Sequence, residues 1–353
     1  MGDVSLTDHR KWLSETLPKH ERLTVAVRHL IENMLKERSI EYLSVGSRVK
    51  DLDGAIDKIS RKQYSDPYEQ LTDLSGIRII TFLEQQVTAI SKIIRELFDI
   101  DDANSLDRTE VLGDDKVGYR STHFVCTLGK KREKLPEYDS LGDLKFEIQV
   151  RTVLQHAWAE LAHDRSFKFG TALPTRIQRK LNLHSGMLEI VDSAFDSISR
   201  EIDDYKNFLE GKTISQIEKI EIDSISLAKF VETISKQHGI NFDDTRLPSR
   251  LIREIKDAGI LNIGQLINRA DAQFIEAYQE GSVSSKAVSF LRLLILYHDI
   301  KQLDAMVSIK RIWKPAFDIL ARKHGKQVLE RELRSRNIEI NRRTRPAKKT
   351  EQA

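Results

Sequence analysis

Two acidic residues stand where proteins commonly mount a metal ligand on a rigid strand. Asp73 comes just before the strand-like run 77–82, in the segment LTDLSGIRII, and Glu147 lies within the strand-like run 144–150. Mg²⁺ prefers oxygen ligands and keeps several waters, so one or two carboxylates together with phosphates usually hold it. The pair therefore predicts a Mg²⁺ site, although Asp73 taken alone also fits a turn-initiating aspartate.

Four positively charged residues suit the binding of a triphosphate. Arg48 and Lys50 project to one side of an extended segment, and Lys58 and Arg61 share one face of the predicted helix 55–62. Converging cations neutralise the charge that moves during phosphoryl transfer. Each of these segments, considered alone, also fits a solvated basic surface.

A third group of polar side chains shares the outer faces of two predicted strands. In GYRSTH, Tyr119 and His123 alternate onto one face, and an aromatic ring on a rigid strand offers a platform for a nucleobase. In FEIQVRT, Gln149 and Arg151 lie on the same face as Glu147. A half-buried tyrosine and a solvated strand face are the simpler alternatives. Taken with the carboxylates and cations, the pattern indicates ATP chemistry on a second nucleoside.

Other functions are disfavoured by what the sequence lacks. It has neither GxxxxGK[ST] nor GxGxxG, so the usual glycine-rich phosphate loops are missing. His156, Glu160 and His163 fall on one helical face without the HExxH spacing, so we expect them to support the strand carrying Glu147 rather than bind zinc. The single cysteine, Cys126, excludes an intrachain disulfide, and no signal peptide or long apolar run is present. These features predict a cytoplasmic protein without a membrane partner.

The order of the predicted elements indicates the fold class. Between residues 18 and 170, strand-like runs alternate with helical periods, which is typical of an α/β (α+β) domain with a mixed central sheet flanked by helices. Beyond Pro174 only helical patterns occur, so we expect an all-α C-terminal region. The predicted divisions are a first domain over 1–211, a helical domain over 212–305 with a helix–hairpin–helix-like segment at 247–270, and a helix with a basic, disordered tail over 306–353.

Four segments, in this order, resemble the signatures of the synthetase domain of the RelA/SpoT alarmone synthetases. They are RVK with a helical lysine (Arg48, Lys50, Lys58), LTDLSGIRII, GYRSTH and FEIQVRTVLQHAWAELAH. Four ordered motifs within ~120 residues are far more specific than one short pattern. About 45 residues precede Arg48, too few for the hydrolase domain of bifunctional members, so a monofunctional domain like that of the small alarmone synthetases is expected.

The resemblance implies an activity and a role for each candidate residue. In that family, ATP donates its β,γ-pyrophosphate to the ribose 3′-hydroxyl of GDP or GTP, which yields (p)ppGpp and AMP. By resemblance, Asp73 and Glu147 would bind Mg²⁺, with Glu147 also a candidate base for the 3′-hydroxyl. The ATP phosphates would be held by Arg48, Lys50, Lys58, Arg61 and Arg78. The acceptor would stack on Tyr119 and would also contact His123, Gln149, Arg151 and Lys116.

Two alternatives remain open at this point. The usual PKxNGY approach to the tyrosine is DDKVGY here, with Val117 in place of the asparagine, and those residues normally help to read guanine. A toxic branch of the family transfers pyrophosphate to the tRNA 3′ end, and some members carry a fused regulatory C-terminal region, which gives the first alternative. The second alternative is an inactive nucleotide-binding regulator.

The C-terminal region has no counterpart in the resemblance. We expect its helices to serve regulation, through a protein partner or self-association. From residue 322 onward the chain has eleven Lys or Arg and four Glu. A basic tail of this kind can contact phosphates, and it can equally serve only to keep the chain soluble.

Overall fold

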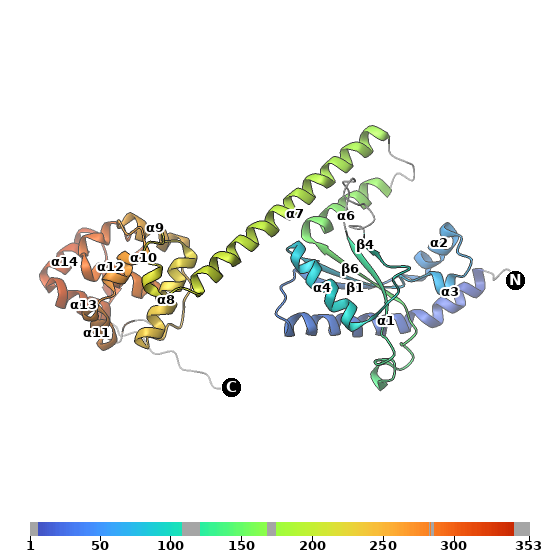
Figure 1. The fold of residues 1–353 in the computed structure, drawn as a ribbon, viewed down its shortest axis with the longest axis horizontal. Coiled ribbons are helices and arrows are strands. Elements are labelled where there is room, and N and C mark those ends of the chain that lie inside the picture. The colour runs from blue at the N-terminus through green and yellow to red at the C-terminus, as the bar shows by residue number, and fades with distance from the viewer. Residues whose placement is uncertain (1–5, 108–120, 168–173, 282, 284–285, 342–353) are drawn as a thin grey trace. The chain divides into compact units, whose positions relative to one another are not determined.

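The computed structural model describes residues 6–107, 121–167, 174–281, 283 and 286–341, and these divide into two compact units between Arg200 and Glu201. Figure 1 shows the first unit in blue to green and the second in yellow to red. The basic tail expected over residues 342–353 lies outside the described residues. No helix in the described part of the chain is long and apolar enough to cross a membrane.

The first unit is built on a mixed β-sheet. Its strands run in the order β1-β2-β6-β5-β3, and β4 pairs with β5 at the edge. The β2–β6 pair is parallel and the other pairs are antiparallel. The strand bounds are β1 Ser44–Val49, β2 Ser75–Thr81, β3 Asp99–Ile100, β4 Leu106–Asp107, β5 Thr122–Thr127 and β6 Phe146–Thr152. The predicted mixed central sheet is therefore confirmed.

One face of this sheet forms the core of the first unit. Alternate residues of β2, β5 and β6 are buried there because successive side chains of a strand point to opposite faces. The long helix α1 (Leu6–Glu37) and helix α4 (Glu84–Leu97) cover this face with apolar residues at helical spacing. The buried set includes Val27, Ile31, Ile90, Ile94, Ile77, Ile79, Phe124, Phe146, Ile148 and Val150. The other face of the sheet is left for polar side chains.

A smaller core fixes helix α2 (Leu52–Lys62) and the turn that leads into β2. Ile56 and Ile59 of α2 pack with Leu71 and Leu74 of that turn and with Leu13 of α1. Asp51 caps the N-terminus of helix α2, and its side chain accepts a 2.7 Å hydrogen bond from the backbone N–H of Gly54. Short helix α3 (Pro67–Gln70) lies between α2 and the turn. The lysine-bearing helix and the aspartate-bearing turn are thereby held together.

Two helices follow β6. Helix α6 is Val153–Phe167 and helix α7 is Thr175–Glu210, and the side chain of His163 lies outside what the structure describes. Buried Asp192 of α7 accepts a 2.6 Å hydrogen bond from the Thr152 hydroxyl, and buried Asp196 accepts one of 2.9 Å from the backbone N–H of Gln85. These bonds attach α7 to the end of β6 and to the start of α4.

The second unit is mostly helical, as the sequence predicts. Its helices are α8 Ser224–His238, α9 Ser249–Asp257, α10 Ile263–Arg269, α11 Ala272–Glu280, α12 Ala287–His298, α13 Lys314–His324 and α14 Lys326–Ser335. Between α9 and α10 the chain turns at Gly259, whose φ of +76° falls in the left-handed region that glycine tolerates best.

The expectation of an all-α C-terminal region needs one correction. Strands β7 (Arg311–Trp313) and β8 (Glu339–Asn341) form a two-stranded parallel sheet. Each strand has three residues, which is too short to produce a recognisable alternation in the sequence. Buried Ile312 and Ile338 join them to the helical core.

Candidate functional site

The strand register brings the predicted polar residues into two adjacent rows on the face opposite the core. Arg78 of β2 pairs with Gln149 of β6, which pairs with His123 of β5. Two residues earlier on β2, Gly76 pairs with Glu147 of β6 and with Arg48 of β1. Directly paired residues project to the same face of a sheet. The sheet thus gathers side chains from four strands on one surface.

Gly76 provides the space in which Arg48 lies. A Cβ atom on Gly76 would stand 3.6 Å from Cγ and 3.7 Å from Nε of Arg48. The Arg48 side chain therefore lies over the backbone of β2, beside the strand that carries Glu147. The sequence predicts that Arg48 projects to one side of an extended segment, but it does not indicate that Gly76 makes room for it.

Glu147 is held by neighbours on the same face. Its Oε1 lies 3.2 Å from Nδ1 of His123 and accepts a hydrogen bond from Nε2 of Gln149, whose own Oε1 accepts a 2.6 Å bond from Arg151. Burial alone would raise the pKa of the Glu147 carboxyl. The hydrogen bonds from His123 and Gln149 and the charges of His123 and Lys58 outweigh burial and lower that pKa to about 2. Glu147 is therefore a carboxylate at neutral pH.

Asp73 occupies the turn just before β2, as the sequence predicts. Its Oδ2 lies 2.7 Å from Nζ of Lys58 and 3.4 Å from Nζ of Lys50. The Lys50 backbone N–H donates a 2.9 Å hydrogen bond to the carbonyl of Leu74, which fixes the end of β1 against this turn. The other carboxylate oxygen, Oδ1, is buried and has no hydrogen-bond partner among the described residues. Such an orphaned acceptor is costly unless a ligand satisfies it.

Lys58 connects the two carboxylates. Its ammonium contacts Asp73 directly, and its charge is one of the causes that lower the pKa of Glu147. Asp73 and Glu147 therefore lie within electrostatic reach of the same cation, although they come from distant parts of the chain. A group of three or more His, Cys, Asp or Glu residues that could hold a metal does not occur in the described part of the chain.

The structure shows where three other predicted residues, Arg78, Arg151 and Arg61, lie. Arg78 donates a 2.8 Å hydrogen bond to Glu160 of α6, so it is already engaged by a carboxylate. Arg151 is buried and directed to Gln149. Arg61 is exposed near the end of α2, and no ion pair joins it to Asp73 or Glu147 within the described ranges. Tyr119 and Lys116 lie outside the described residues.

A positioning pair beneath the site also went unrecognised in the sequence. Nδ1 of His20, on α1, lies 2.8 Å from the hydroxyl of Ser75, the first residue of β2, and both residues are buried. Burial lowers the pKa of His20 to about 4, so its ring is neutral near pH 7. The only signal in the sequence is a lone histidine in a helical period, which cannot be distinguished from a surface histidine.

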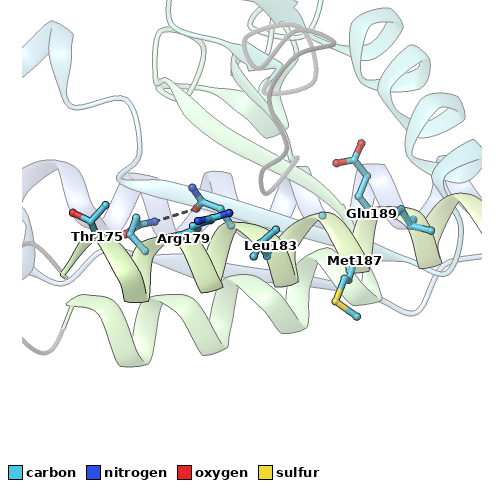
Figure 2. A pocket seen from close by; sticks show the side chains of 9 residues that line it. Thr175, Arg179, Leu183, Met187 and Glu189 are labelled. Atoms are coloured by element: carbon cyan, nitrogen blue, oxygen red, sulfur yellow. Dashed lines mark hydrogen bonds between the residues drawn. The ribbon is translucent and has the colours of Figure 1, made fainter.

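A cavity of about 710 Å³ lies elsewhere, along α7. Figure 2 shows Thr175, Arg179, Leu183, Met187 and Glu189 along this helix. All of its described lining residues belong to α7, and none of the candidate site residues is among them. The chemistry-bearing surface is therefore the polar face of the sheet and not this cavity.

Comparisons with known proteins match the first half of the chain. Residues 47–172 match the family model described as a region found in RelA / SpoT proteins. GTP pyrophosphokinase YjbM of Bacillus subtilis (strain 168) is 26% identical over 203 residues, which is 55% of this chain and 92% of that protein. GTP pyrophosphokinase YwaC of the same organism is 24% identical over 161 residues, covering 44% and 73%.

Solved structures match the same part. The crystal structure of small alarmone synthetase 1 from Bacillus subtilis has a TM-score of 0.46 and 21% identity, covering 55% of this chain and 98% of that one. The family model and the two curated relatives agree with the motifs on β1, β2, β5 and β6. Roughly the first half of the chain is thus a RelA/SpoT synthetase domain, similar to small alarmone synthetases, to which a helical C-terminal region is added.

Proposed function

We propose that this chain is an ATP-dependent pyrophosphokinase that transfers the β,γ-pyrophosphate of ATP to the ribose 3′-hydroxyl of GDP or GTP. The observation that carries the proposal is the position of Lys58, whose Nζ lies 2.7 Å from Asp73 and whose charge also acts on Glu147. Two acids that interact with the same cation suit a metal-bound triphosphate. The names of the two curated relatives, both GTP pyrophosphokinases, support the same reaction class.

In the proposed reaction, the 3′-oxygen of the acceptor attacks the β-phosphorus of ATP. A bond forms between that oxygen and the β-phosphorus, and the bond from the β-phosphorus to the oxygen that bridges to the α-phosphorus breaks. AMP leaves with the electrons of the broken bond, and the hydroxyl proton passes to a base or to solvent. The reaction demands in-line positioning and charge neutralisation more than covalent help from the protein.

The carboxylates fit a divalent metal of the Mg²⁺ type. Asp73 Oδ1 is buried without a hydrogen-bond partner among the described residues, and Glu147 is ionised because its pKa is lowered to about 2. Asp73 and Glu147 would hold Mg²⁺, with the remaining oxygens supplied by phosphates and water. When bound, Mg²⁺ would polarise the phosphoryl oxygens and reduce the repulsion between them and the acceptor.

The ionisation of Glu147 bears on its own role. A general base works best when its pKa lies near the working pH, and a carboxyl with a pKa of about 2 binds protons weakly at neutral pH. A fully ionised carboxylate is, in contrast, what a hard cation prefers. We therefore assign Glu147 to metal binding first, with its role as a base subordinate.

Cations around the carboxylates would hold the ATP phosphates. Lys50 and Lys58 already point to Asp73, and Arg48 lies over Gly76 next to the Glu147 strand. Arg78 would have to leave Glu160 to reach a phosphate, and Glu160 is 57% exposed. Exposed ion pairs contribute about 0–1 kcal/mol, so a triphosphate competes easily for this arginine.

A second acceptor is favoured by one observation. Val117 stands in DDKVGY, where the PKxNGY signature that this segment resembles has asparagine, at a position that the resemblance implies would help to read guanine. Transfer to the 3′ end of tRNA would use the same ATP-binding residues and a different acceptor-binding surface. The same assay separates the two candidates.

The test is a transfer assay with purified full-length chain, Mg²⁺ and ATP labelled at the γ-phosphate. GDP, GTP and deacylated tRNA are offered in separate reactions, and products are resolved by thin-layer chromatography and denaturing gels. The proposal expects label on GDP or GTP with one AMP released per transfer. If only tRNA is labelled, the acceptor is tRNA and not a guanine nucleotide. If the chain binds ATP and no acceptor is labelled, it is a nucleotide-binding regulator without transfer activity.

A further inference from the structure

Helix α7 exposes apolar side chains and bonds to the rest of the first unit through polar ones. Buried Asp192 and Asp196 accept hydrogen bonds from Thr152 and from the backbone of Gln85. At 3.6 residues per turn, a stripe of exposed apolar residues lies on the opposite side of the helix. The members of this α7 stripe are Leu183, Met187, Ile190, Val191, Ala194 and Ile198. A surface helix normally turns its apolar stripe toward a core, so we expect another surface to cover this one.

The spacing along the α7 stripe is that of a coiled coil. Leu183, Met187, Ile190 and Ala194 follow one another at intervals of four, three and four residues, and the other members widen the stripe. Such intervals place apolar side chains on one seam, into which a second helix can fit its own. Leu183 and Met187 also line the cavity along α7 (Figure 2), so the surface beside the seam is recessed. The covering surface that fits best is therefore another amphipathic helix.

The exposed area suits an interface between two copies of the chain. The five large side chains of the stripe and the adjoining Phe195 are between 40% and 71% exposed. They present on the order of 600 Å² per copy, so two copies would bury about 1,200 Å² in total, the lower end of the range for specific interfaces. Two α7 stripes are thus sufficient to hold a dimer without a contribution from other elements.

The charges at the two ends of α7 are complementary to those of a second copy that runs in the opposite direction. The first eight residues, 175–182, contain three Arg or Lys and no acid, a net charge of +3. The last ten residues, 201–210, contain four Asp or Glu and one Lys, a net charge of −3. An antiparallel copy brings each basic end beside an acidic end, whereas a parallel copy would place like charges together.

We propose that α7 is the interface of a homodimer in which the α7 stripes of two copies pack against each other in antiparallel orientation. The two-fold axis of such a dimer passes near the middle of the stripe, at Ile190 and Val191, and each basic end meets the partner's acidic end. The dimer goes beyond the proposed transfer reaction, because no residue of the stripe is proposed to bind ATP, metal or acceptor. A failure of one proposal therefore leaves the other intact.

The test measures the mass of the purified full-length chain by light scattering after size-exclusion chromatography, and its dimer Kd by sedimentation equilibrium. We expect a dimer that dissociates on dilution. Ile190→Glu places a charge in the middle of the stripe and should raise the dimer Kd at least about tenfold. Val25→Glu puts the same charge at an exposed apolar residue of α1, and as the matched control it should leave the Kd unchanged.

Two charge-reversed variants test the direction of the helices. Arg179→Glu/Lys180→Glu and Asp203→Lys/Asp204→Lys should each raise the Kd of their own homodimer about three- to tenfold at low salt, because like charges then meet at both ends. When the two variants are mixed, a heterodimer should recover most of the wild-type affinity, since opposite charges meet again. In a parallel dimer, either reversal alone would leave the affinity unchanged or raise it.

Three outcomes would overturn the proposal. The first is a chain that stays monomeric at every concentration measured, which would mean that a different protein covers the stripe. The second is an oligomer whose Kd is not raised by Ile190→Glu, and the third is a homodimer that neither charge reversal weakens. Circular dichroism of each variant verifies its folding. If Ile190→Glu does not fold, the charge-reversed variants still decide the matter, because they leave the stripe unchanged.

Discussion

The ammonium nitrogen of Lys58 lies 2.7 Å from Oδ2 of Asp73, and this contact joins helix α2 to the turn before β2. Both side chains are about one-fifth exposed, so the pair is screened less than a surface ion pair. The same lysine acts on Glu147, which lies on the neighbouring strand β6. The proposed ATP site is organised around this lysine.

Removal of the Lys58 charge should impair transfer more than removal of the Arg61 charge on the same helix. Lys58→Gln is expected to lower kcat/KM by about 10²–10³, the range seen when one charge-stabilising donor is lost. Arg61→Gln should lower it by less than about tenfold, because the structure brings Arg61 to neither carboxylate. AMP release measured over a range of ATP concentrations checks this, and equal losses in both variants would refute the special place of Lys58.

Glu147 should stay ionised throughout the working pH range. The hydrogen bonds from His123 and Gln149 lower its pKa to about 2 despite burial, so its carboxyl signal should not titrate above about pH 4. Carbon-detected NMR of chain labelled at the glutamate carboxyls follows this directly, with Glu147→Gln identifying the signal. His123→Asn removes a hydrogen bond while burial remains, and should move the titration to higher pH. A wild-type titration near pH 6 or 7 would instead support a general base.

Glu160→Gln should free Arg78 for ATP. The Arg78–Glu160 pair is partly exposed and worth about 0–1 kcal/mol, so its loss should lower the KM for ATP by no more than about fivefold, with kcat unchanged. Glu96→Gln breaks the exposed Arg38–Glu96 pair away from the site and serves as the control. A rise in KM, or a fall in kcat, would mean that Glu160 assists Arg78 rather than competing for it.

Acid should destabilise the first unit through His20. Because burial lowers its pKa from 6.5 to about 4, the unfolded chain binds more protons between those values, and stability falls as pH decreases through this window. The contribution is on the order of 3 kcal/mol and is fully present above about pH 6.5. Because the pKa of Glu147 is lowered from 4.5 to about 2, protonation of its carboxyl causes a second loss of stability as the pH falls through that range.

Denaturant unfolding at several pH values measures this effect. His20→Asn can keep the hydrogen bond to Ser75 without a titrating ring, so its stability should vary little between pH 6.5 and 4.5. His29→Asn, an exposed histidine on the same helix, should retain the wild-type pH dependence. If His20→Asn also keeps that dependence, His20 is not its cause.

The sequence was sufficient for the elements that carry the chemistry. Asp73 precedes a strand and Glu147 lies on one, and the alternation in FEIQVRT correctly separates the core face from the polar face. The mixed sheet follows because strands and helices alternate over the first half of the chain. Ordered motifs also located the family match at residues 47–172.

What the sequence could not provide are contacts between distant segments. Arg78 meets Glu160, and His20 meets Ser75, only because α6 and α1 pack where the fold places them. No periodicity encodes such pairs, since each residue alone looks like an ordinary surface or core position. Strands of three residues, as in β7 and β8, are likewise too short to leave a pattern.

The central claim is that Asp73 and Glu147 hold one divalent ion together. Binding of Mn²⁺ to the full-length chain, in the presence of a non-hydrolysable ATP analogue, is measured by electron paramagnetic resonance for wild type, Asp73→Asn, Glu147→Gln and the double variant. We expect one tight ion in the wild type, its loss in each single variant, and no further loss in the double variant. Retention of that ion in either single variant, or independent and additive losses, would contradict the claim.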